Sequence, residues 1–228
     1  MWAIIKKEVK NYFYSPIGYV FIGAFMLLSS IFFYLFVLSY GSVEFSGLFY
    51  STSELLTFTV ALLTMGMFAG ERKNGTEVLL FTSSKSITSI VIGKFLAALV
   101  VILITEVFSM IYYVILCSFN GGITQVAETI TVLIGFILLA GAYISFGGFM
   151  SSLTENQIIA GITTVILLLA TWFLPSLSSS FAMLSPINFF QKYPQGIISI
   201  TDTVGLVSIT VLFTVLTIII LQRKKNLK

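Results

Sequence analysis

The stretch E-R-K-N-G-T-E at residues 71–77 interrupts a chain that is otherwise almost free of charge. Its charged side chains cannot stay in hydrocarbon, because each ionised group costs about 3 kcal/mol or more at the centre of a bilayer. The residues that follow, V-L-L-F at 78–81, are apolar and need a surface to bury against. A short segment that is charged in front and apolar behind, held between hydrophobic runs, suits docking onto another protein. We therefore expect function to concentrate here.

The composition indicates that the rest of the chain lies in a membrane. Hydrophobic residues make up 57% of the 228 residues, charged residues 9%, and the mean hydropathy is +1.05. A soluble domain carries about 25% charged residues. Each spanning helix needs roughly 20 apolar residues. The apolar runs predict an all-α polytopic membrane protein, a single transmembrane domain over 1–228, with six transmembrane helices at about 17–39, 52–69, 91–118, 129–152, 157–174 and 203–222.

The positive charges predict the orientation of these spans. With six spans both termini share one side. Eleven of the twelve Lys and Arg residues then lie on that side, and only Lys192 lies opposite. Cytoplasmic segments of membrane proteins carry an excess of Lys and Arg. We therefore expect both termini and the 71–90 segment to be cytoplasmic.

Two further segments flank the spans. Residues 1–16 read as an amphipathic interfacial helix that ends at Ser15-Pro16, because the residue before a proline is disfavoured in the α region. We place Glu8 on its polar side. The alternative is a simple flank whose lysines set topology. Residues 175–202, apolar but broken by three prolines, predict short helices that lie on or dip into the outer leaflet.

Several single residues receive structural interpretations. Gly75-Thr76 predicts a turn followed by a helix N-cap, since a Thr hydroxyl accepts from free amides at a helix start. Lys94 can extend its ammonium group back to the lipid headgroups. Asp202 is placed as the N-cap of the last span, and the small residues Gly141, Ser145 and Gly148 on one face of span four predict close helix packing.

Glu106 is interpreted as the only ionisable residue well inside an apolar run. A carboxylate at that depth is expected to be paired, protonated or turned toward water. One interpretation is a contact in a translocation path. The other is a structural carboxyl group that is hydrogen-bonded to a Ser or Thr of a neighbouring span.

Catalytic and cofactor motifs are missing from the sequence. There is no G-x-x-x-x-G-K-[ST] loop to cradle a phosphate, no histidine, and one cysteine, Cys117. Metal sites built on His or paired Cys are therefore excluded within the chain. We expect no enzyme activity, no cofactor and no nucleic-acid partner for this chain, so energy for any transport must come from elsewhere.

Three stretches carry a family resemblance: E-V-K-N-Y-F-Y-S-P-I-G-Y at 8–19, E-R-K-N-G-T-E-V-L-L at 71–80 running on to I-V-I-G-K-F at 90–95, and S-P-I-N-F-F-Q-K-Y-P-Q-G-I-I-S-I-T-D at 185–202. In this order they resemble the ABC-2-type permeases, the membrane subunits of ATP-driven exporters with the type V fold. The resemblance is strongest to the gliding-motility and copper-nitrous-oxide-reductase-associated branch. Ser84, Phe189 and Ser199 stand where that family often has proline, histidine and aspartate.

The resemblance implies a permease in the plasma membrane of a bacterium or archaeon. It implies a second permease subunit, identical or not, and two cytoplasmic ATPase subunits that hold ATP and Mg. It also implies a cytoplasmic coupling helix whose ATPase-coupling residues are Glu71, Arg72, Gly75, Thr76, Glu77, Val78, Leu79, Leu80 and Phe81. Glu71 and Arg72 would face the ATPase or the N-terminal interfacial helix. Two other readings stay open: a self-powered secondary transporter or channel, and a structural subunit that anchors a partner complex.

Overall fold

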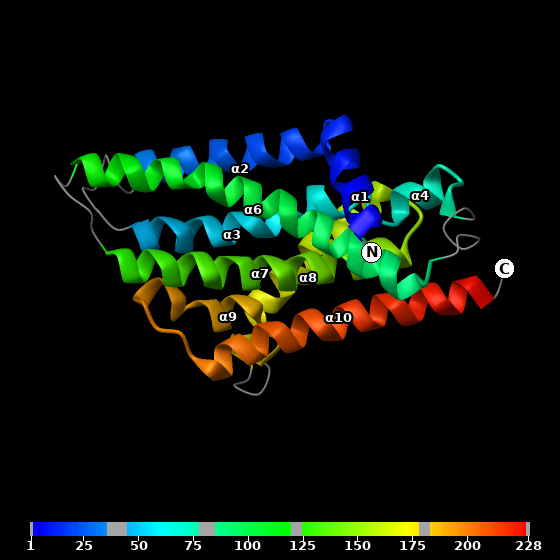
Figure 1. The fold of residues 1–228 in the computed structure, drawn as a ribbon. Coiled ribbons are helices and arrows are strands. Elements are labelled where there is room, and N and C mark those ends of the chain that lie inside the picture. Colours follow the sequence, from blue (N-terminus) through cyan, green and yellow to red (C-terminus); the bar gives the residue numbers. More distant parts are fainter. Residues whose placement is uncertain (1, 36–44, 78–84, 120–124, 178–182, 227–228) are drawn as a thin grey trace.

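The computed structural model describes residues 2–35, 45–77, 85–119, 125–177 and 183–226, and within these ranges the chain is helical without strands (Figure 1). The elements in chain order are α1 (Trp2–Tyr14), α2 (Ile17–Phe33), α3 (Phe45–Thr64), α4 (Ala69–Lys73), α6 (Ile87–Phe119), α7 (Val126–Leu153), α8 (Gln157–Leu177), α9 (Pro186–Phe190), the 3₁₀ turn η3 (Tyr193–Gln195) and α10 (Ile200–Asn226). The predicted all-α class is confirmed.

The long helices match the predicted spans. Five described helical segments are long and apolar enough to cross a membrane, and there are six when the bent pair α1 and α2 is counted as one span. The two helices of that pair meet at 68°, directly after Ser15-Pro16, where the proline ring was expected to end the first helix.

Helix α3 differs most from its predicted bounds of 52–69. It begins at Phe45 and ends at Thr64, and α4 follows after a break at residues 65–68. The break is held by tertiary contacts, because the Ser151 hydroxyl of α7 accepts from the amides of Phe68 and Ala69 at 3.0 and 3.1 Å and donates to the Met65 carbonyl at 3.1 Å. As a consequence Glu54 lies in the middle of α3 rather than near its start.

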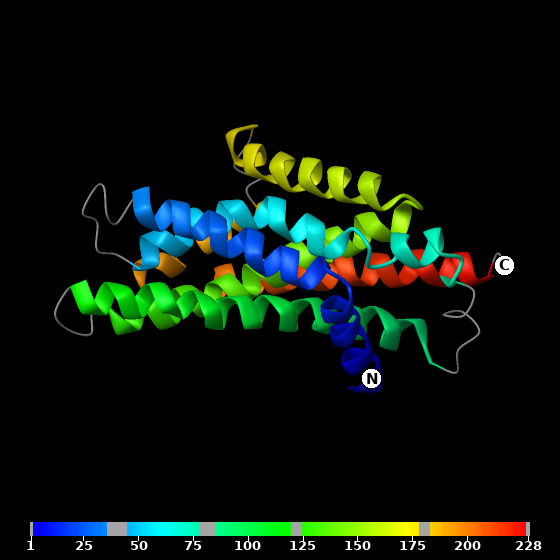
Figure 2. The same ribbon diagram turned by 90° about the horizontal axis from the view of Figure 1, so that it is seen from above.

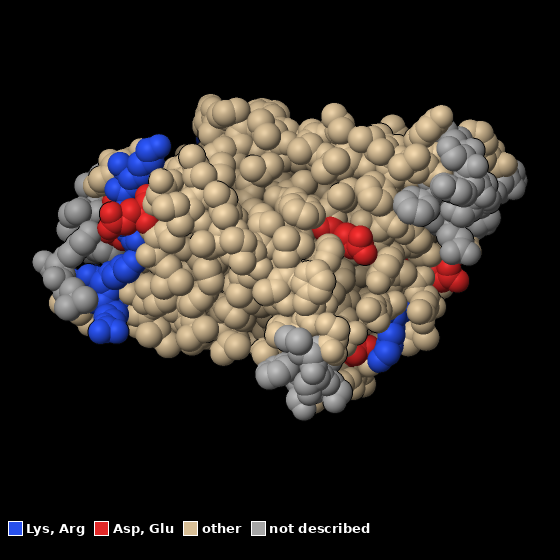
Figure 3. All heavy atoms as spheres, turned by 180° about the vertical axis from the view of Figure 1, so that it is seen from behind, with Lys and Arg blue, Asp and Glu red and all other residues tan. Residues whose placement is uncertain are grey.

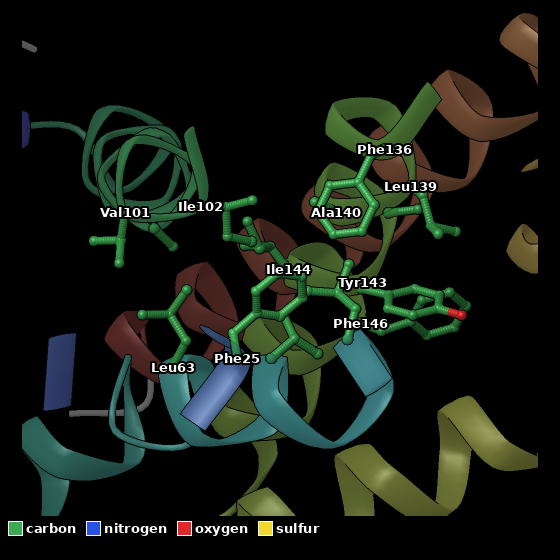
Figure 4. Packing of buried hydrophobic residues seen from close by; sticks show 14 of the residues in the cluster. Phe25, Leu63, Val101, Ile102, Phe136, Leu139, Ala140, Tyr143, Ile144 and Phe146 are labelled. Atoms are coloured by element: carbon green, nitrogen blue, oxygen red, sulfur yellow. The ribbon is translucent and has the colours of Figure 1, made fainter. Parts of the chain in front are cut away.

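Helix α7 forms the centre of the bundle. It packs against α3, α6, α8 and α10, and Figure 2 shows α8 on the outside of this arrangement. The expected close packing is present, because Gly141 and Gly148 face side chains of α6, α10 and the α3–α4 segment, and Gly147 meets Thr64 of α3. Around it lies the aromatic and aliphatic core, which includes Phe136, Leu139 and Tyr143 (Figure 4).

The segment before α10 folds into the short helices predicted for it. Phe190 of α9 and Tyr193 of η3 are fully buried, and the Tyr193 ring lies so close to Gly135 that a larger residue would not fit there. The prediction that Asp202 caps the last span is wrong. Helix α10 begins at Ile200, so Asp202 lies inside the first turn, where it pairs with Lys192 at 3.0 Å.

Candidate functional site

The polar segment 71–77 lies at one end of the bundle, together with α1 and the C-terminal end of α10 (Figure 1). We call this the α4 end and the opposite one the α9 end. Charged side chains gather at the two ends, with a largely uncharged surface between them (Figure 3). The α4 end holds the residues that the sequence predicted to couple to a partner.

Arg72 ties the polar segment to the end of α7. Its Nε and Nη2 atoms both lie 2.9 Å from Oε1 of Glu77, and Nη1 donates to the Thr154 carbonyl at 2.9 Å. Nη2 also donates to the Ser152 carbonyl at 3.2 Å. The side chains of Arg72 and Glu77 are 9% and 8% exposed. Both are therefore turned inward, and they brace the segment against the bundle.

Lys94 of α6 joins two other helices to this segment. Its ammonium group lies 3.2 Å from Oε2 of Glu8 on α1 and 2.8 Å from Oε1 of Glu71 on α4. It also lies 5.7 Å from the centre of the Phe68 ring, within cation–π range. The Lys94 side chain is only 5% exposed. We call Glu8, Glu71 and Lys94 the buried charge cluster.

The cluster corrects two sequence interpretations. Lys94 does not extend to the headgroups, because two carboxylates compensate its charge inside the protein. Glu8 does not lie on an exposed polar face; it is buried on the side of α1 that packs against α6. Glu71 meets α1 through Lys94, as the resemblance allowed.

Close packing of α1 on α6 makes the cluster possible. Gly93 precedes Lys94, and a side chain at that position would overlap Ile4 of α1. Since Ile4 and Glu8 are one helical turn apart, the close approach at Gly93 brings Glu8 to Lys94. Sequence reasoning missed this arrangement, although the spacing of Ile4, Glu8 and Tyr12 at steps of four was a usable signal.

The exposed tip of the segment is residues 73–76. Gly75 has a φ of 69°, in the left-handed region that glycine adopts without strain. The Thr76 hydroxyl donates to the Glu71 carbonyl at 3.1 Å and so closes the turn. The predicted N-cap role of Thr76 concerns a helix that runs into Val78–Phe81, and this apolar quartet lies outside the described residues.

A cavity of about 190 Å³ adjoins the buried charge cluster. Its polar lining comes from α1, α4, α6 and α8 and includes Glu8, Asn11, Glu71, Asn74, Lys94 and Gln157. Above it the Tyr12 hydroxyl donates to the Leu63 carbonyl of α3 at 3.3 Å. The α4 end thus encloses a small polar space between the N-terminal helix and the end of α3.

Among the described residues, two carboxylates lie near the middle of a spanning helix, where the sequence indicated one. Glu106 of α6 is 6% exposed, and its Oε1 atom has no hydrogen-bond partner in the part of the chain that the structure describes. Glu54, in the middle of α3, is exposed. Glu106 is therefore not the only ionisable residue inside an apolar run. Among the described residues no group of three or more His, Cys, Asp or Glu side chains could hold a metal ion.

The helical spans, the braced polar segment and the N-terminal helix packed against it define a multi-pass membrane protein with an organised polar end. A family model described as ABC-2 family transporter protein matches residues 48–227. This match covers well over half of the chain, so the chain belongs to the ABC-2 transporter family. It is the permease subunit of an ABC transporter, and its family works with an ATPase subunit. A comparison with curated proteins gave no match.

Proposed function

We propose that the chain is the permease of an ATP-driven exporter in the plasma membrane of a bacterium or archaeon. A second permease pairs with it, and two cytoplasmic ATPase subunits, which hold ATP and Mg, bind at the α4 end. The observation that carries this proposal is the buried position of Lys94, which ties α1, α4 and α6 into one unit. Such a unit is suited to carry motion from a docked partner into the membrane.

The distribution of charge supports a cytoplasmic α4 end. Lys6, Lys7 and Lys10 of α1, Lys73, and the last turn of α10 with Arg223, Lys224 and Lys225 all belong to this end. In the described residues Lys192 is the only cation of the α9 end. Since cytoplasmic segments are enriched in Lys and Arg, this asymmetry favours the orientation proposed here.

Coupling then works through rigid contacts. The exposed tip at residues 73–76 and the apolar quartet Val78–Phe81 contact the ATPase, while Glu71, Arg72 and Glu77 face inward and hold the tip in place. When the ATPase subunits close, they displace the 71–90 segment. Arg72 transmits this displacement to α7, and the buried charge cluster transmits it to α1 and α6.

The test removes the apolar anchor without touching a span. A fully buried Leu contributes roughly 1.5–3 kcal/mol, and each 1.4 kcal/mol is about tenfold in affinity. Leu79→Ser with Leu80→Ser should therefore weaken ATPase association by about a hundredfold or more. The matched control is Met183→Ser with Leu184→Ser, since both of these residues are exposed at the other end. A pull-down of tagged permease should recover ATPase with the control and not with the 79/80 variant.

The two alternative functions predict different results in the pull-down experiment. A secondary transporter or channel would bring down no ATPase even as wild type. A structural anchor would bring down a partner, but ATP would not drive transport by the complex.

Within the proposed exporter, Glu106 is a candidate contact in the translocation path. Glu106→Gln tests this role, because loss of transport with unchanged assembly would support it.

A further inference from the structure

Glu54 occupies a position in which a lipid-facing carboxylate is not expected. It lies nine residues after Phe45 and ten before Thr64 in α3, so about 14 Å of helix separates it from either end at 1.5 Å per residue. Its side chain is exposed. Charged residues within spans are costly in hydrocarbon and almost always face water or a polar partner. The exposed side of α3 at this depth therefore does not face lipid tails.

Within the described ranges, no Lys or Arg forms an ion pair with Glu54. In the described part of the chain, no hydrogen bond or ion pair reaches its carboxylate, and the helices α2, α3, α7 and α8 contain no Lys or Arg. Lys94 is already bound to Glu8 and Glu71 at the α4 end. Among the described residues, the Glu54 carboxylate therefore lacks a cationic partner and is open to a positive group of a ligand.

A stripe of exposed and half-buried residues on α3 runs through Glu54. Tyr50, which is half-buried, and Gly47 lie about one and two turns before it on the same side, and Phe58 and Leu62 follow at steps of four, with 48% and 37% exposed. The stripe is polar toward the α9 end and apolar toward the α4 end.

A polar cavity lies near each end of α3. Toward the α9 end, a cavity of about 410 Å³ is lined by Ser46, Gly47 and Tyr50 of α3 together with Gln191 and Gln195. Toward the α4 end, the cavity of about 190 Å³ beside the buried charge cluster includes Leu63, Gly66 and Met67. Leu63 and Met67 are buried, so of these two cavities the one toward the α9 end borders the exposed side of α3, about one turn from Glu54.

Aromatic side chains lie on α3 and on the helices behind it. Tyr143 of α7 is fully buried, and Figure 4 shows its hydroxyl pointing away from Val101 and Ile102. Trp172 of α8, which is half-buried, donates its indole N–H to that hydroxyl at 3.3 Å. Aromatic faces attract cations, and Phe58 adds an exposed apolar ring one turn from Glu54.

We propose that the exposed side of α3 lines the transport path between two paired permease subunits, and that Glu54 binds the positive group of an amphiphilic organic cation. This inference rests on the proposed permease function. The carboxylate compensates the charge of the ligand, and Phe58 and Leu62 contact its apolar body. If two identical copies pair about a twofold axis, each contributes the same patch, so two Glu54 carboxylates then face one path.

The first experiment asks whether water reaches this position. Glu54→Cys is made in a Cys117→Ser background, and Val107→Cys serves as the control, since Val107 is 72% exposed on the spanning helix α6. Both full-length variants are treated in liposomes with a positively charged methanethiosulfonate, which reacts with thiols in water. We expect residue 54 to react at least tenfold faster than residue 107. Equal, slow reaction at both positions would overturn the path.

The second experiment asks whether Glu54 selects cations. Binding of tetraphenylphosphonium and of its anionic analogue tetraphenylborate is measured by equilibrium dialysis, using the full chain with any copurifying subunits in nanodiscs. Glu54→Gln should weaken tetraphenylphosphonium binding at least tenfold and leave tetraphenylborate binding unchanged. The control Glu155→Gln, at an exposed position in the turn between α7 and α8, should behave as wild type.

The outcomes separate this site from the proposed function. If Glu54→Gln binds tetraphenylphosphonium as wild type does, the cation site is wrong, whatever the reactivity of residue 54. ATPase copurification is measured independently, and Glu54 is remote from residues 71–81. Loss of ATPase association with intact cation binding would reject ATP-driven transport and keep the site, whereas the reverse result would reject only the site.

Discussion

At the scale of single residues, Lys94 compensates two carboxylates that come from different helices. Glu8 is 8% exposed, and the Lys94 side chain is 5% exposed. Removing one member of a buried ion pair leaves an uncompensated charge, which costs about 3–5 kcal/mol, whereas replacing the whole group by neutral residues is often close to neutral. The cluster therefore acts as a unit, and its members should be changed together as well as singly.

We predict that Lys94→Met lowers the free energy of unfolding by about 3–5 kcal/mol, because Glu8 and Glu71 lose their shared cation. Lys6→Met, at an exposed position of α1, should change the free energy of unfolding by less than about 0.5 kcal/mol. Unfolding of the purified protein in detergent, followed by fluorescence, measures both. The triple variant Lys94→Met, Glu8→Gln, Glu71→Gln should recover most of the loss. Equal stability of the Lys94 and Lys6 variants would contradict the role of the cluster.

Sequence reasoning noticed the charged residues of the cluster but did not predict that they pair with one another. The charges at 71–77 marked the segment because charge in an apolar chain is conspicuous. Glu8, however, is flanked by Lys7 and Val9, and local pattern alone placed it on the polar side of α1. Its burial depends on Gly93 and Lys94, which are 85 and more residues away in the chain. Pairing across such a separation is determined by tertiary packing, which a helical period does not encode.

At the scale of elements, hydropathy predicted each span because about 20 apolar residues suffice to identify one. It failed where helices are shaped by their neighbours. The start of α3 at Phe45 contains Ser46, Gly47 and Ser51, which lower its hydropathy, although the bundle buries much of this turn. The break after Thr64 depends on the Ser151 hydroxyl of α7. Because the predicted span began and ended too late in the chain, the sequence placed Glu54 at the edge of the span, whereas the structure places it in the middle of α3.

The close contact between α3 and α7 gives a test at this scale. A methyl group at Gly147 would overlap the Thr64 side chain, whereas a methyl group at Gly23 in α2 would meet nothing within 4 Å. Overpacking a core costs about 1–3 kcal/mol. We therefore predict that Gly147→Ala destabilises the protein by this amount, while Gly23→Ala is neutral or stabilising by up to about 1 kcal/mol.

Thermal unfolding in detergent compares the two alanine variants. Adding Thr64→Ala to Gly147→Ala should restore part of the stability, because it removes the atoms that the new methyl group overlaps. If Gly147→Ala and Gly23→Ala have the same stability, α3 and α7 do not approach as closely as the structure describes.

At the scale of the whole molecule, the two ends differ in charge and in construction. The α4 end carries most of the described cations and braces its polar segment with ion pairs, whereas the α9 end is closed by the buried aromatic residues Phe190 and Tyr193. The asymmetry of charge was visible in the sequence because it depends only on counting. The packing of aromatic residues at the α9 end was not visible in the sequence, because it depends on the missing side chain at Gly135 of α7, which leaves room for the Tyr193 ring.

This asymmetry predicts the orientation of the protein in the membrane. Lys73→Cys and Gln191→Cys, each in a Cys117→Ser background, place a thiol at an exposed position of the α4 end and of the α9 end without breaking a described ion pair. Because basic segments are retained in the cytoplasm, an impermeant maleimide added to intact cells should label residue 191 and not residue 73. Permeabilised cells should show labelling of both, and the Cys117→Ser background alone should show none. Labelling of residue 73 from outside would invert the topology, and the ATPase could then not dock at the α4 end, because ATP is available only in the cytoplasm.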